Sequence, residues 1–199
     1  YYAPPHGVAP VASVLIAGVT GVRQRYYGRF ARYLAEQGMA VATFDYRGIG
    51  DSAPATLTGY DAMMHHWGEE DLPGAIDWLH EKHPDLPMGY VAHSVGGQML
   101  GLAPNNDRIR AAWFVSCQVG SMTLWKMSPF KVGFLLQSYM LIPLLSRIYG
   151  YFPAKWLGLG ENLPAGVARQ WAWWCSHPQY LFGDARVNHH AYFERVTSA

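Results

Sequence analysis

Cysteine is scarce in this sequence of 199 residues, which contains only Cys117 and Cys175. Two cysteines so far apart fit no metal-ligand spacing and make no disulfide framework, so we expect neither a zinc site nor a cystine-stapled fold. Both are expected to be reduced, buried thiols, which indicates a cytoplasmic location. The chain also has no large excess of either charge, since its formal net charge is +1. Without a basic stripe we expect no nucleic-acid partner.

Targeting signals and clear membrane spans are also lacking. The sequence begins at Tyr1, without an initiator methionine, and no charged-then-apolar signal pattern follows. We therefore expect an internal piece of a longer chain. The uncharged run Val132–Ser146 is short and is interrupted by Gln137, Ser138 and Pro143, so we expect no stable membrane insertion.

Apolar residues are plentiful and alternate with helical patterns from residue 11 to residue 116. Half of the chain is hydrophobic and 15% is aromatic, which excludes a disordered chain. Nearly continuous apolar runs predict strands at 11–17, 39–44 and 109–116, and a fourth directly before residue 94. Helical spacing predicts helices near 26–34 and 67–82 and one after residue 97. Strand–helix alternation of this kind builds a parallel α/β sheet.

The stretch from Met88 to Gly97 carries the most information about chemistry. An apolar run leads into Ser94, which small residues flank, and a helix-compatible segment follows. This is the pattern of a nucleophile elbow, a tight strand-to-helix turn that exposes a serine hydroxyl above the end of a sheet. Gly96 and Gly97 suit such a turn, because a bulky side chain there would collide with the strand or block the helix. Ala92 replaces the usual first glycine of the motif.

Three segments together carry a family resemblance. They are the strand-end loop 17–21 (AGVTG), the loop 45–52 (DYRGIGDS) and the turn 92–97 (AHSVGG). In this order they resemble the α/β-hydrolase superfamily, in particular its serine-hydrolase branch of esterases, lipases and serine aminopeptidase-like proteins. The resemblance covers about residues 10–117. It implies an α/β-hydrolase core over 1–117 with a parallel sheet, and a helical cap over 118–199, the fold being incomplete at both ends.

The cap is expected to be helical and rich in bulky apolar residues. Residues 118–183 hold five of the eight tryptophans, and prolines at 129, 143, 153 and 164 interrupt the segment. These aromatic side chains can line an acyl pocket, or they can simply pack the cap onto the core.

The resemblance implies a serine hydrolase that acts on a carboxylic ester or amide through an acyl-enzyme. Ser94 would be the nucleophile, and the backbone N–H groups of Val95 and Val19 would bind the oxyanion. Neither a cofactor nor a metal is expected, and the partner is a small-molecule acyl substrate. In this family the catalytic acid and then the histidine follow the serine. We expect both beyond residue 199, so that this piece is inactive or impaired and exposes a sheet edge through which it can self-associate.

Other assignments of the candidate residues stay open. Asp184 with His189 or His190 is the one acid–histidine set that follows Ser94 in family order, although it lies in the cap. His93 adjoins the serine but points to the opposite side of the strand, which favours a packing or hydrogen-bonded role. Charged residues of the loop 45–52 are expected to fix that loop. Alternatives to hydrolysis are a non-catalytic small-molecule binding protein and an acyltransferase on the same fold.

Overall fold

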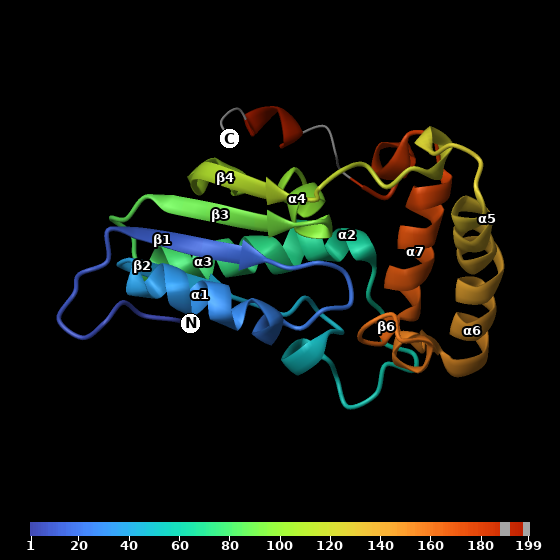
Figure 1. The fold of residues 1–199 in the computed structure, drawn as a ribbon, viewed down its shortest axis with the longest axis horizontal. Helices are drawn as coiled ribbons and strands as arrows, with labels where there is room; N and C mark the ends of the chain where they lie inside the picture. Colours follow the sequence, from blue (N-terminus) through green and yellow to red (C-terminus); the bar gives the residue numbers. More distant parts are fainter. Residues whose placement is uncertain (188–191, 197–199) are drawn as a thin grey trace.

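Four parallel strands form the sheet that the alternation predicts (Figure 1). The computed structural model describes residues 1–187 and 192–196. Its strands lie in the order β2-β1-β3-β4, with bounds β1 Ala12–Ala17, β2 Met39–Thr43, β3 Met88–His93 and β4 Ile109–Val115. Ala17 pairs with Ala92, so β1 and β3 end side by side. The predicted α/β class and its four strands are confirmed.

Helices cover both faces of the sheet, because successive residues of a strand point to opposite sides. Val14 and Ile16 pack against α1 (Gly28–Glu36). Leu15 and Ala17 face the other way and belong to the core cluster of α3 (Leu72–Lys82) and α4 (Val95–Leu100). The predicted helix 67–82 starts earlier than expected, since α2 (Met64–His66) runs through a π turn (Trp67–Asp71) into α3.

The second part of the chain is mostly helical. Figure 1 shows three helices standing beside the carboxyl ends of the strands: α5 (Pro129–Leu136), α6 (Ile142–Tyr149) and α7 (Ala165–Ser176). The prediction of helices alone missed a short antiparallel ladder of β5 (Tyr151–Phe152) and β6 (Leu163–Pro164). Val167 and Trp174 of α7 join the same core cluster as the sheet. The predicted boundary between core and cap at residue 117 therefore runs through a shared hydrophobic core. The division into two domains stays a prediction.

One cap helix is longer than its sequence suggests. The run that was expected to be too interrupted for a span lies inside one helix, Pro129–Tyr149, of 21 residues. Pro143 does not break this helix, because the π turn Gln137–Leu141 directly precedes α6 and changes the hydrogen-bond pattern that the proline would otherwise interrupt. By length and composition alone the helix could cross a membrane. The expectation of no stable insertion stays a prediction.

Strand β4 is the outer strand of the sheet in the described part of the chain, paired only with β3. Trp113 is 62% exposed and Val115 is 39% exposed. An apolar edge of this kind invites pairing with another chain. We expect this chain to self-associate and Val115→Lys to shift it toward monomer, because a charged side chain disfavours edge pairing. Light scattering after size exclusion measures this.

The control is Val11→Lys, which places lysine on an exposed valine before β1 and should leave the association unchanged. Equal behaviour of the two variants would exclude the β4 edge as the contact.

Candidate active site

Ser94 occupies a sharp turn between β3 and α4. Its φ of 53° and ψ of −114° lie in a region that non-glycine residues avoid, and such residues cost on the order of 1–3 kcal/mol each. The Ser94 N–H donates to the carbonyl of Val115 at 2.9 Å, which continues the β3–β4 ladder to the turn itself. The strand, the strained serine and the helix thus follow one another as the sequence motif requires.

Gly96 makes this turn fit against the neighbouring strand. A Cβ on Gly96 would lie 2.5 Å from the carbonyl oxygen of Ala17, the last residue of β1. Since that oxygen is backbone, it cannot turn aside as a side chain could. Glycine is therefore required here, and it brings the start of α4 against the loop that follows β1.

The loop after β1 is held by Tyr27, which the sequence pattern predicts only as part of a helix near 26–34. The hydroxyl of Tyr27 accepts from the Val19 N–H at 3.0 Å and lies 3.0 Å from Nδ1 of His93. Burial raises the pKa of Tyr27, so its hydroxyl stays protonated, and the tautomer of His93 sets which of the two groups donates. The hydrogen-bonded role expected for His93 agrees with this contact.

This network bears on the two expected oxyanion donors. The Val19 N–H is engaged by Tyr27, so it can receive an oxyanion only after that hydroxyl moves. Val95 is the first residue of α4, and the first N–H groups of a helix lack intrahelical acceptors. Both assignments stay predictions.

The loop 45–52 is fixed from two sides, as expected, but by partners that the sequence did not reveal. Asp45 accepts from the backbone N–H groups of Gln24 at 2.7 Å and Asp51 at 3.0 Å. Arg47 donates to Asp71 at 2.7 Å and also pairs with Glu70. These contacts account for the charges of Asp45 and Arg47 without a substrate.

Both cysteines are free, and Cys117 lies under the turn. Its Sγ is 3.5 Å from the Ala92 carbonyl, and a Cβ on Gly97 would approach it to 2.6 Å. Burial raises the pKa of Cys117, and raises that of the buried Cys175 to about 12. Both are therefore thiols rather than nucleophilic thiolates.

A general base in hydrogen-bond contact with Ser94 is not seen among the described residues. Across 1–187 and 192–196, no histidine or carboxylate makes a hydrogen bond to the Ser94 hydroxyl. Asp184 is engaged elsewhere: its carboxylate accepts from Gln170, Trp174 and Arg186. His189 and His190 lie outside the described residues, so the alternative that pairs them with Asp184 is untested. Nor does any His, Cys, Asp and Glu cluster within the described ranges suit a metal ion.

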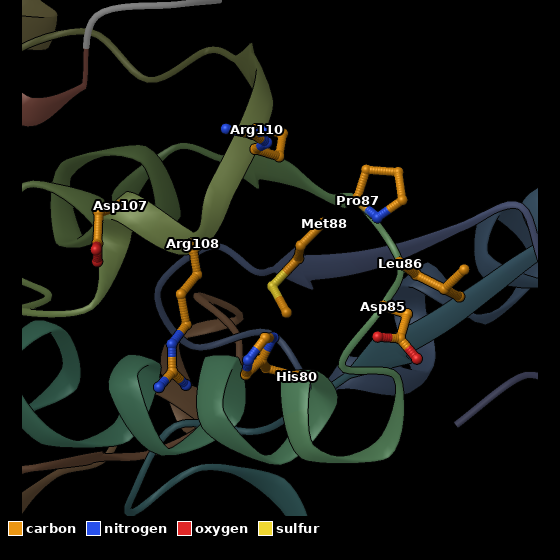
Figure 2. Close-up of a pocket in the computed structure, with 8 residues that line it drawn as sticks. All are labelled: His80, Asp85, Leu86, Pro87, Met88, Asp107, Arg108 and Arg110. Atoms are coloured by element: carbon orange, nitrogen blue, oxygen red, sulfur yellow. The ribbon is translucent and has the colours of Figure 1, made fainter.

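One cavity lies far from this chemistry. Its volume is about 420 Å³, and Figure 2 shows residues that line it, among them Met88, His80, Arg108 and Arg110. Met88 begins β3, so the cavity lies at the amino end of the strand, about 17 Å from its carboxyl end at 3.3 Å per residue. Ligands of open parallel sheets bind at the carboxyl ends. A second cavity, of about 520 Å³, borders that end, between Gly21 and Val22 of the β1 loop and Gly160 and Glu161 of the cap.

The site geometry agrees with a family comparison. The family described as "Serine aminopeptidase, S33" matches residues 9–144, more than half of the chain. The chain belongs to this family. Its place within the α/β-hydrolase superfamily, expected from the three motifs, is thereby confirmed.

The individual sequence relatives match only part of this chain. Esterase FrsA of Citrobacter koseri is 34% identical over 76 residues, which are 38% of this chain and 18% of that protein. The esterase FrsA of Escherichia fergusonii is 30% identical over a stretch of the same length. The chain thus matches less than a fifth of either relative.

One solved structure supports the fold. A soluble variant of monoglyceride lipase from Saccharomyces cerevisiae, solved with a substrate analog, superimposes with a TM-score of 0.54 at 19% identity. The likeness covers 74% of this chain and 47% of the lipase chain. It supports the α/β-hydrolase fold.

Proposed function

We propose that this chain carries the nucleophile and the oxyanion donors of a serine hydrolase that cleaves carboxylic esters. The observation that carries the proposal is the strained backbone of Ser94, at a β-strand-to-helix turn where Gly96 packs against Ala17. A φ of 53° is costly for serine and is retained where the turn serves to expose a hydroxyl. The name of the sequence relatives, esterase FrsA, favours an ester, while the family description, an aminopeptidase, keeps an amide as the alternative.

The reaction would proceed by acyl transfer to water. The Ser94 Oγ attacks the carbonyl carbon while a histidine takes its proton and passes it to the leaving alcohol. The N–H groups of Val95 and Val19 stabilise the oxyanion, the latter once Tyr27 has moved. Water then attacks the acyl-enzyme with the same histidine as base and restores Ser94. That histidine lies outside the described residues, either at His189 or His190 or in polypeptide beyond residue 199.

Fluorophosphonate labelling with peptide mapping tests this proposal. We expect an adduct on Ser94 in the longest natural polypeptide that contains these residues, and Ser94→Ala should lower ester turnover by on the order of 10⁴-fold or more. Ser116 is the matched control, because it has the same φ of 53° at the end of β4. Ser116→Ala should label normally.

Four outcomes separate the alternatives. An adduct that persists in Ser94→Ala would contradict the proposal and indicate another nucleophile. A folded protein without any adduct would also contradict it and would favour a binding protein. Transfer to an added alcohol in excess of hydrolysis would identify an acyltransferase. Labelling of the 199-residue chain alone would show that the base lies within it, and His189 and His190 would be mutated next.

A further inference from the structure

The helix Pro129–Tyr149 presents most of its apolar surface to solvent. Only 17% of its most apolar 18-residue window is buried. Ser138, Ile142 and Ser146, spaced four residues apart, are the buried positions of this helix, and its α6 part packs against α7. The covered side is therefore narrow and lined partly by small residues.

The uncovered side of the same helix is a stripe of large apolar residues. Leu136, Met140, Leu144 and Ile148 are 55–63% exposed and recur at the four-residue spacing that aligns side chains on one helical face. Phe130 and Tyr139 of the same helix are 71% and 61% exposed. We call these six residues the cap face. Large exposed apolar patches mark surfaces that meet a protein or a lipid.

Positive charge is concentrated in the cap, as binding to an anionic partner requires. No Asp or Glu occurs from residue 108 to residue 160. Residues 1–117 carry eight Lys or Arg against eleven Asp or Glu, whereas residues 118–183 carry five against one. That one acid, Glu161, pairs with Arg23 and Lys155. Arg147 of α6 and Lys126, shortly before α5, are exposed.

We propose that the cap face docks this protein onto an anionic lipid surface. An apolar helix face with cations on the same segment lies in the interface of an anionic bilayer. Burial of the apolar side chains and attraction of the cations to anionic headgroups both favour binding there. A second copy of the chain fits less well, because a symmetric contact would bring the same cations together. Spanning the bilayer would strip the helix from α7 and expose the buried hydroxyls of Ser138 and Ser146. The proposal needs no hydrolytic activity and stands apart from the function of Ser94.

Co-sedimentation with vesicles tests the apolar part of this proposal. We expect binding to mixed phosphatidylcholine–phosphatidylglycerol vesicles, with far less binding to phosphatidylcholine alone. Tyr139→Asp should weaken the binding about tenfold. Tyr33→Asp is the matched control, since Tyr33 of α1 is 56% exposed, and it should change binding less than about twofold. Circular dichroism of each variant establishes that it is folded.

A second pair of variants tests the charge. Arg147→Glu should weaken binding and flatten its salt dependence, whereas Arg110→Glu, at the amino end of the sheet, should not. The proposal would be overturned if the cap variant and the control variant of each pair lost vesicle binding equally. It would also be overturned if the unmodified chain did not bind vesicles, or bound neutral and anionic vesicles equally. Retention after alkaline carbonate extraction would indicate a spanning helix instead. A dimer in buffer that Tyr139→Asp dissociates, without vesicle binding, would show that a second copy covers this face.

Discussion

Replacing Gly96 by alanine should destabilise the protein by about 3 kcal/mol or more. The added Cβ would lie 2.5 Å from the carbonyl oxygen of Ala17 and 3.0 Å from its carbonyl carbon. Overpacking typically costs 1–3 kcal/mol when side chains can move, but here the neighbour is backbone within the sheet. For a domain of this size the midpoint of thermal unfolding should fall by about 10 °C. The same shift should displace Ser94 and abolish its labelling.

The same substitution in α3 gives a matched control with the opposite sign. Gly74 is exposed in the middle of the chain's amphipathic helix 64–82, and a Cβ there meets nothing within 4 Å. Gly74→Ala should therefore stabilise the protein by about 0.5–1 kcal/mol through helix propensity. If Gly96→Ala melts within about 2 °C of the unmodified chain, the Ser94 turn does not pack against β1 as closely as the structure shows.

Local patterns in the sequence were sufficient for the core of the fold. Apolar runs that end at glycine or charged residues placed the strands to within one or two residues, since a strand buried on both faces leaves a continuous run. The turn at Ser94 was predictable for a related reason. Its motif lies in the six consecutive residues 92–97, so it can be recognised without knowing the fold, although the close contacts that require its glycines are with the distant residues Ala17 and Cys117.

Contacts between distant segments left no local signal. Tyr27 has helical spacing with its neighbours, yet its hydroxyl reaches Val19 and His93, a result of how the segment before α1 packs. Cys117 lies under the turn only because β4 pairs with β3. The cap face was hidden for another reason. When a helix is apolar on every side, periodicity cannot indicate which side is buried, and only the packing of α6 on α7 decides it.

Removing the carboxylate of Asp184 should cost about 3 kcal/mol. Asp184 is 4% exposed, and it accepts from Gln170 at 2.8 Å, Trp174 at 2.9 Å and Arg186 at 2.7 Å. Gln170 in turn accepts from the His65 N–H at 3.1 Å, which links α7 to α2. Asp184→Ala leaves buried donors without an acceptor, and breaking such a buried charged contact is strongly destabilising. Urea unfolding beside Asp85→Ala, at an exposed aspartate, measures the difference.

The pH dependence of that difference follows from the pKa of Asp184. Burial by itself raises this pKa, but the hydrogen bonds from Arg186, Gln170 and Trp174 outweigh burial and hold it well below the ordinary value of 3.8. A carboxyl whose folded pKa is depressed stabilises the fold fully above its unfolded pKa, and this stabilisation is lost as the pH falls through and below that value. The gap between the unmodified chain and Asp184→Ala should thus be constant from about pH 6 to pH 8 and shrink below pH 4. A gap that widens on acidification would mean that Asp184 is protonated in the folded protein, and the cap would then be anchored by neutral hydrogen bonds alone.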